Sequence, residues 1–208
     1  EANPADLVLD RESGVFHVTG TPARSVGWAD VARRYAEDEG AVLLREHDVK
    51  PDGATFPFGA HVAVVAVDTE TGRVELLRHI ACDDCGVIMN PMIVAGQVHG
   101  GVAQGVAQAL WEEMRYDTDG NPLTANFMDY AFPSAAEFPS FERVAMETPT
   151  TRNALGAKGI GESGTIGSTP AVQNAVVDAL AHLGVRHVDM PCTSERVWRA
   201  IETAKAEV

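Results

Sequence analysis

Residues 91 to about 114 have the apolar periodicity of one long helix, yet this helix would contain several glycines. Asn90 can cap its first turn, and Pro91 suits its first position. Each glycine in a helix interior costs about 1 kcal/mol relative to alanine. The glycines are Gly96, Gly100, Gly101 and Gly105. Their cost must be offset, either by close packing of another backbone or by a ligand that lies across the glycine face and is oriented by Gln97 or Gln104.

A second glycine-rich stretch, residues 158–167, places one carboxylate, Glu162, among its glycines. Glycine allows a positive φ and lets a ligand approach the main chain closely. A carboxylate held there can act as a general base on a bound molecule. A glycine-rich turn before a helix is, however, more often only a connection. The sequence predicts that the next helix begins directly after this stretch, with Thr169 as its N-cap and Pro170 as its first residue.

The remaining segments mix helices and strands. Residues 61–67 and 74–80 are β-prone and are joined by a turn, which predicts a hairpin. The first of these runs is nearly all apolar, as in a strand buried on both faces. Short strands are also expected over 41–46, 144–147 and 185–190, and helices over 28–39 and after Thr193. This mixture indicates an α+β fold with mixed sheets and packed helices.

Composition and charge argue against several functions. A formal net charge of −14 on 208 residues disfavours nucleic acid as a partner, because phosphate binding needs a basic face. The chain has no run of about 18 apolar residues, so no membrane span is expected. Residues 1–4 have neither the basic nor the apolar part of a signal peptide, so none is expected. These features predict a cytoplasmic protein.

The cysteines are expected to be free thiols. Cys82 and Cys85 form a C-x-x-C pair, but a zinc site would need a second pair of ligands. A redox pair should lie at a helix N-terminus, whereas this pair ends a predicted strand. Together with Cys192, these thiols fit a reducing cytoplasm. No side chain is predicted to ligate a metal, and four histidines are expected to be core or surface residues: His61, His79, His182 and His187.

Residues 159–164 match the letters of the dinucleotide-binding pattern G-x-G-x-x-G, but their context does not fit. That motif follows a hydrophobic strand and opens a helix directly. Residues 151–155 do not form such a strand, and no acidic residue ends a second strand about 20 positions later. A generic dinucleotide-binding domain is therefore disfavoured. Glycine amides and a helix N-terminus could still bind a phosphorylated ligand between Gly164 and Thr169.

Three motifs, in order, resemble those of the molybdenum hydroxylases. Residues 156–167, followed by 170–175, are similar to the active-site segment of the large subunit in this family. Residues 84–91 and 96–101 resemble a second motif, and residues 127–130 a third. The chain is thus identified as the C-terminal portion of the molybdenum-cofactor-binding large subunit of the xanthine oxidase, aldehyde oxidoreductase and aerobic carbon monoxide dehydrogenase family.

The resemblance implies an organisation of the chain and roles for particular residues. Residues 1–208 would form a single compact unit of the molybdopterin-binding domain, with about 1–50 peripheral and 51–208 facing the cofactor. Glu162 matches the family's active-site glutamate, the general base, which we expect to be buried in a glycine-walled pocket. Gln97 matches a glutamine that reaches the pterin. The other residues implied to contact the cofactor are Gly100, Gly101, Lys158, Gly161, Ser163, Gly164 and Thr165. For Lys158, a loop-bracing or solvent-facing role is the alternative.

The resemblance also implies a cofactor and partners. The cofactor would be molybdenum bound by molybdopterin, in the cytosine dinucleotide form, and the substrate an aldehyde, an N-heterocycle or carbon monoxide. Electrons would leave through iron–sulfur and flavin (FAD) subunits, because this chain lacks the clustered cysteines that an iron–sulfur cluster needs. The remainder of the large subunit would be a further partner. The alternative is a cofactor-cradle or assembly fragment that is not catalytic on its own.

Overall fold

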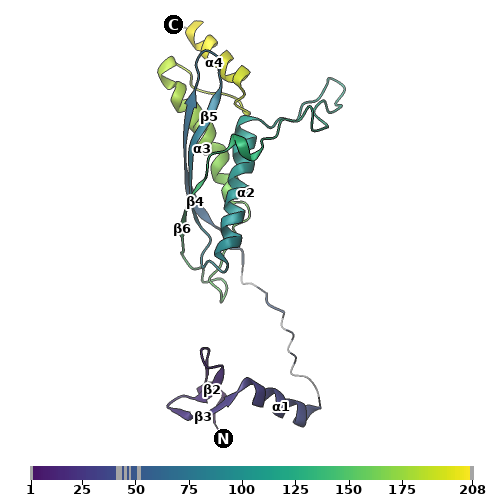
Figure 1. Cartoon of the computed structure of the whole chain (residues 1–208), viewed down its shortest axis with the longest axis vertical. Helices are drawn as coiled ribbons and strands as arrows, with labels where there is room; N and C mark the ends of the chain where they lie inside the picture. The colour runs from purple at the N-terminus through teal and green to yellow at the C-terminus, as the bar shows by residue number, and fades with distance from the viewer. Residues whose placement is uncertain (1, 41–43, 45, 47, 51–52, 207–208) are drawn as a thin grey trace. The chain divides into compact units, whose positions relative to one another are not determined.

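The computed structural model describes residues 2–40, 44, 46, 48–50 and 53–206. It has the expected α+β architecture, with helices packed on sheets of mixed strand direction. The chain divides into two compact units, Glu1–Lys50 and Pro51–Val208 (Figure 1). The strand predicted over 41–46 lies mostly outside the described residues. The single compact unit expected over 1–208 stays a prediction.

The first unit is an antiparallel sheet followed by a helix. A 3-10 turn, Pro4–Asp6, precedes β1 (Leu7–Asp10), β2 (Val15–Val18) and β3 (Thr21–Gly27), and α1 covers Trp28–Glu39. α1 has the predicted bounds, and Gly40 ends it with a left-handed φ of 64°. The Phe16 ring packs edge-on against Trp28 at a centroid distance of 4.6 Å. This contact joins the sheet to the first turn of α1.

The second unit contains the predicted hairpin. β4 (Phe58–Val67) pairs antiparallel with β5 (Val74–Asp84), and β6 (Glu142–Met146) pairs parallel with β5. The prediction that the first strand is buried on both faces is wrong for this chain. Val62 and Val64 are exposed, whereas Ala63, Val65 and Val67, which alternate with them, are half-buried. Within this unit, only one face of β4 is covered.

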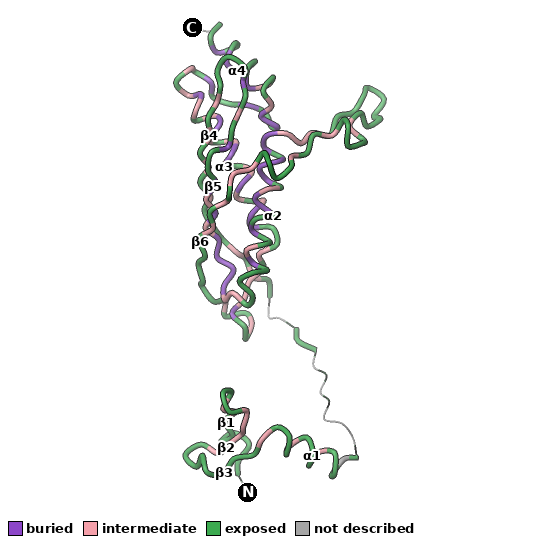
Figure 2. Tube along the Cα trace, viewed as in Figure 1, coloured by how far each residue is buried: buried purple, intermediate pink, exposed green. Residues whose placement is uncertain are grey.

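Helices α2 (Pro91–Leu110) and α3 (Ser163–Leu180) pack on the covered face. α3 contacts β4 and β5, and α2 packs along α3 (Figure 1). The buried residues of the unit concentrate at these contacts (Figure 2). Asn90 caps α2 as predicted, by accepting hydrogen bonds from the amides of Met92 and Ile93. A 3-10 turn, Ala181–Leu183, and α4 (Ser194–Ala206) complete the unit.

The start of α3 differs from the prediction. The helix begins at Ser163 rather than after Thr169, and Pro170 lies in its interior. Because proline lacks a donor amide, α3 forgoes one backbone hydrogen bond there. The Thr169 hydroxyl, which was expected to cap the helix, donates to a carbonyl of α2 instead. The glycine-rich loop is therefore shorter than predicted, and Gly164 and Gly167 are helical.

Two other boundaries also differ. Residues 185–190 form no strand. The Gln173 side chain donates to the Val188 carbonyl at 2.9 Å and so provides the hydrogen bond that a neighbouring strand would have made. α2 ends at Leu110, about one turn before the predicted end.

Candidate functional site

α2 and α3 run in the same direction and are joined by a repeated contact. Thr165 Oγ1 donates to the Gly101 carbonyl at 3.0 Å. Four residues later, Thr169 Oγ1 donates to the Gly105 carbonyl at 3.2 Å. A Cβ on Gly101 would stand 3.0 Å from Gly164 Cα, and one on Gly105 would stand 2.9 Å from a backbone oxygen of α3. Close packing therefore offsets the helix cost of these two glycines.

The other two glycines of α2 face open space. A Cβ on Gly96 or on Gly100 would meet nothing within 4 Å. Packing among the described residues therefore does not explain these positions. This face of α2 is open to a ligand or to a protein surface from outside the described part of the chain.

Gln97 lies four residues before Gly101, where the threonine-to-carbonyl contact does not continue. The residue four positions before Thr165 is Gly161, which has no hydroxyl group to donate a hydrogen bond. Gln97 Oε1 lies 3.6 Å from the position of a Cβ on Gly161. Gln104 accepts a hydrogen bond from Thr165 at 3.3 Å. By contrast, Gln97 is exposed and has no hydrogen-bond partner among the described residues. Its amide is free to bind a ligand.

Glu162 is the N-cap residue of α3. Its carbonyl accepts a hydrogen bond from the Ile166 amide at 3.0 Å, while its carboxylate makes no capping bond. The side chain is exposed, so the burial expected of a base is not supplied by the described part of this chain. Glu162 directly follows Gly161, the neighbour of Gln97. The predicted base and the predicted cofactor-binding amide thus lie at the same end of the helix pair.

Ser163, the first residue of α3, is turned into the protein. Its side chain is buried, and its Oγ has no hydrogen-bond partner among the described residues. A buried hydroxyl without a partner is unfavourable by about 1–3 kcal/mol. Ser163 lines a small cavity of about 100 Å³ together with Phe58, His61 and Asp83. The start of α3 therefore faces polar groups of the sheet across this cavity.

Lys158 braces the loop before α3. Its ammonium pairs with the Asp84 carboxylate at 2.9 Å, and both side chains are almost inaccessible to solvent. The ammonium also lies 4.5 Å from the centroid of the Phe58 ring. Burial opposes the ionisation of Asp84, but hydrogen bonds from Thr148 and Lys158 outweigh it and hold the pKa of this carboxyl well below its usual range. This is the loop-bracing alternative, and a contact of Lys158 with a cofactor stays a prediction.

Three other predicted contacts lie within the helix pair. Gly101, Gly164 and Thr165 meet at the interface of α2 and α3, and a Cβ on Gly164 would stand 2.7 Å from the Val98 carbonyl oxygen. Protein atoms occupy the α2-facing side of Gly164. Cofactor binding by these residues stays a prediction, as it does for Gly100, Gly161 and Ser163.

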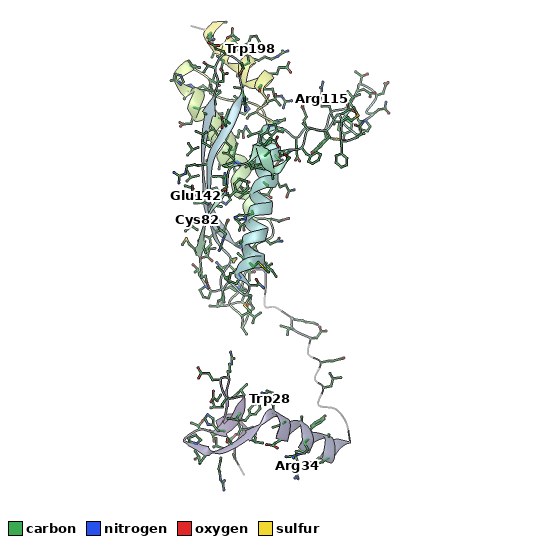
Figure 3. The ribbon with its side chains drawn as sticks, viewed as in Figure 1. Trp28, Arg34, Cys82, Arg115, Glu142 and Trp198 are labelled. Atoms are coloured by element: carbon green, nitrogen blue, oxygen red, sulfur yellow. The ribbon has the colours of Figure 1, made fainter. Side chains whose placement is uncertain are left out.

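The third family motif lies apart from this site. After α2 ends, residues 111–134 form an irregular arm that extends away from the helices and sheet of the unit, as Arg115 shows in Figure 3. Phe127 and Met128 are 84% and 96% exposed there. A 3-10 turn, Ala135–Glu137, follows the arm. Gln97 lies near the opposite end of α2, so this chain does not bring the motif to the site.

A buried chain of polar side chains, which the sequence motifs did not indicate, lies beneath α3. His79 Nε2 lies 3.2 Å from His61 Nδ1, and His61 Nε2 lies 3.3 Å from both carboxylate oxygens of Asp83. The pKa of His79 is lowered from 6.5 to about 4, mainly by burial and also by His61, while Asp83 acts in the opposite direction. Both histidines are core residues, as expected. The pattern was visible, because residues 79, 81 and 83 alternate along one strand and must share a face.

The cysteines of the described chain are unpaired. Cys82, on β5 (Figure 3), Cys85 and Cys192 are free, and burial raises the pKa of Cys192 to about 11. Across the described residues, no group of three or more histidine, cysteine, aspartate or glutamate side chains could hold a metal ion. In the same part of the chain, every helix is too short or too polar to cross a membrane.

The relatives of similar sequence are large subunits of enzymes. The family model described as molybdopterin cofactor-binding domain matches residues 1–139. The carbon monoxide dehydrogenase large chain of Hydrogenophaga pseudoflava is 41% identical over 206 residues, covering 97% of this chain and 25% of its own length. The nicotine 6-hydroxylase large subunit of Paenarthrobacter nicotinovorans is 39% identical over 209 residues, covering 96% and 25%.

A solved structure agrees with these relatives. The crystal structure of a Cu,Mo-CO dehydrogenase in its carbon monoxide reduced state matches with a TM-score of 0.87 at 37% identity. The match covers 100% of this chain and 26% of that chain. The present chain thus spans about a quarter of the length of the relatives it matches.

Proposed function

This chain belongs to the molybdopterin cofactor-binding domain family, as part of a large subunit of the xanthine oxidase and carbon monoxide dehydrogenase type, and we propose that it holds a molybdenum–molybdopterin cofactor at the N-terminal ends of α2 and α3. The cofactor is the cytosine dinucleotide form. The assembled enzyme works in the cytoplasm, with the remainder of the large subunit and with iron–sulfur and FAD subunits that remove electrons.

The unpaired Gln97 amide between two glycines carries this proposal. An amide both donates and accepts hydrogen bonds, which suits the mixed donors and acceptors of a pterin ring. A Cβ on Gly161 would stand 3.6 Å from Gln97 Oε1, and a Cβ on Gly100 would meet nothing in the described chain within 4 Å. The residues present therefore fit a flat, polar ligand that approaches the main chain closely.

Glu162 is the general base of the proposed reaction. When bound, the molybdenum cofactor supplies the two-electron oxidation of the substrate. The Glu162 carboxylate, held at the N-cap of α3, accepts the proton released as oxygen is added to the substrate carbon. The substrate is an aldehyde, an N-heterocycle or carbon monoxide, which the likeness to a carbon monoxide dehydrogenase and a nicotine 6-hydroxylase supports.

The second candidate function is a cofactor cradle that is inactive by itself. The exposure of Glu162 favours it, because a general base acts in a site from which water is largely excluded. A cradle would bind the cofactor without turnover until the other parts of the enzyme enclose Glu162. The two candidates differ in the activity of the isolated chain but not in its ligand.

The test compares Glu162→Gln with Glu70→Gln in the assembled enzyme. Glu70 is an exposed residue of the β4–β5 turn and serves as the matched control. We expect Glu162→Gln to lower turnover by at least about 100-fold while molybdenum and acid-released CMP stay stoichiometric, and Glu70→Gln to change neither. Full turnover of Glu162→Gln would refute the role of the base. Bound NAD(P) or FAD in place of molybdenum would instead support a dinucleotide-binding domain.

A further inference from the structure

The sheet face beneath α3 carries three polar side chains in an otherwise apolar core. The side chains of His61 and Asp83 are 2% and 4% exposed, and His79 is completely buried. Burying such groups is unfavourable unless they are hydrogen-bonded. Their hydrogen bonds to one another satisfy every nitrogen and carboxylate oxygen in this polar chain except His79 Nδ1. The arrangement is therefore rigid, because breaking any one bond would leave a buried polar group unsatisfied.

The hydrogen bonds fix the His61 ring from both sides. The Asp83 carboxylate accepts a hydrogen bond from the N–H at His61 Nε2, and in a neutral ring this leaves His61 Nδ1 to accept one from the N–H at His79 Nε2. The Asp83 carboxylate is itself confined, since a Cβ on Gly59 would stand 2.6 Å from its Oδ1. Rotation of the His61 ring would break both bonds at once. Its plane is therefore set by the sheet.

α3 rests on the face of this ring. A Cβ on Gly167 would stand 2.7 Å from three atoms of the His61 ring, so the helix backbone packs directly on it. Ser163 lines the same small cavity as His61 and Asp83. The first turn of α3 lies between these two contacts and directly follows its N-cap residue, Glu162. The orientation of His61 is thus transmitted to the start of the helix.

We propose that His61, held by Asp83 and His79, is a positioning residue that fixes the first turn of α3 and with it the direction of the Glu162 carboxylate. The effect on turnover rests on the proposed function, in which Glu162 is the base. A proton relay is disfavoured, because the chain ends at His79 Nδ1, which is buried and has no partner among the described residues. A misplacement of about 1 Å can lower a rate by about 100-fold.

The test uses His61→Phe in the assembled enzyme. Phenylalanine retains a ring against Gly167 but can make neither hydrogen bond, so the variant removes the two bonds that orient the ring. We expect kcat to fall at least about 10-fold while KM and molybdenum content remain close to those of the wild type. Amide hydrogen exchange should become faster over residues 160–170 and stay unchanged over α4. His187→Phe is the matched control, because His187 forms an exposed pair with Asp189.

Gly167→Ala gives a second, independent perturbation if His61→Phe does not fold. Its methyl group pushes the helix away from the ring while the polar chain stays intact, and the same kcat loss and local exchange are expected. Wild-type kcat and exchange over 160–170 in the folded variant would overturn the proposal, as would faster exchange without any change of kcat. Because exchange does not depend on chemistry, it still reports on α3 if Glu162→Gln shows that the proposed function itself is wrong.

Discussion

Alanine substitutions at two glycines of α2 should have opposite effects on stability. Gly105 faces α3, where a Cβ would stand 2.0 Å from Ser168 Oγ and 2.9 Å from the Thr165 carbonyl oxygen. Gly100 faces open space, where a Cβ would meet nothing within 4 Å. Both residues lie in the interior of the same helix, so alanine brings the same gain in helix propensity at each. The difference between the variants therefore reports the packing alone.

The magnitudes follow from these contacts. Gly100→Ala should stabilise the chain by about 1 kcal/mol, the propensity difference between glycine and alanine. In Gly105→Ala this gain is opposed by overpacking of about 3 kcal/mol, the upper end for an added methyl group, because one close neighbour is backbone. The net result is a loss of about 2 kcal/mol. For a chain of this size, 1 kcal/mol corresponds to about 2–4 °C in the unfolding midpoint.

Two measurements on each variant separate packing from cofactor binding. Thermal unfolding should place the midpoint of Gly100→Ala above that of the wild type and the midpoint of Gly105→Ala about 4–8 °C below it. Molybdenum content should be retained in Gly105→Ala. It should be reduced in a third variant, Gly100→Leu, because its larger side chain enters the proposed site. Equal destabilisation by both alanines would refute the division of the glycines. Full molybdenum in Gly100→Leu would refute the placement of the cofactor.

Two buried charged or titratable groups give further predictions. Burial holds the pKa of His79 at about 4, below 6.5, so unfolding between these pH values takes up a proton. The free energy of unfolding should therefore fall from pH 6.5 to 4, by up to about 1.4 kcal/mol per pH unit. This contribution should be absent in His79→Gln when urea unfolding is measured at a series of pH values. Lys158→Met removes the cation of the buried pair with Asp84 and should cost about 3 kcal/mol. Arg78→Met, which breaks an exposed pair, should cost under about 1 kcal/mol, and equal urea midpoints for the two variants would contradict this reasoning.

Local rules were sufficient for elements whose ends are determined by their own residues. The Asn90 cap, the left-handed Gly40 and the hairpin between β4 and β5 all follow from turn and capping chemistry. The start of α3 does not, because Thr169 and Pro170 carry the local signature of a helix N-terminus. The Thr169 hydroxyl contacts α2, across 64 positions of sequence. That tertiary contact cannot be read from the residues beside it.

The part of the candidate site that could be predicted consists of polar residues in glycine-rich segments. Gln97 and Glu162 stand out locally, by a polar amide on a glycine-rich helix and a carboxylate in a glycine-rich loop. The sequence allows two explanations for the α2 glycines, and the structure separates these glycines by their position around the helix. Gly101 and Gly105 face α3, while Gly96 and Gly100 face outward. All four residues are glycines, so sequence alone could not tell which of them face α3 and which face outward.

The exposure of Glu162 bears on both candidate functions, the general base and the cofactor cradle. A carboxylate at an open helix N-terminus is solvated, and water there competes with any substrate for its lone pairs. Exclusion of that water requires surface from outside the described chain, since the described residues leave Glu162 exposed. In the proposed function, the described part holds the ligand and directs the carboxylate but does not enclose it. Under the proposed function, turnover then requires the assembly that encloses Glu162, and an isolated chain that binds the cofactor without activity is the result that the cradle predicts.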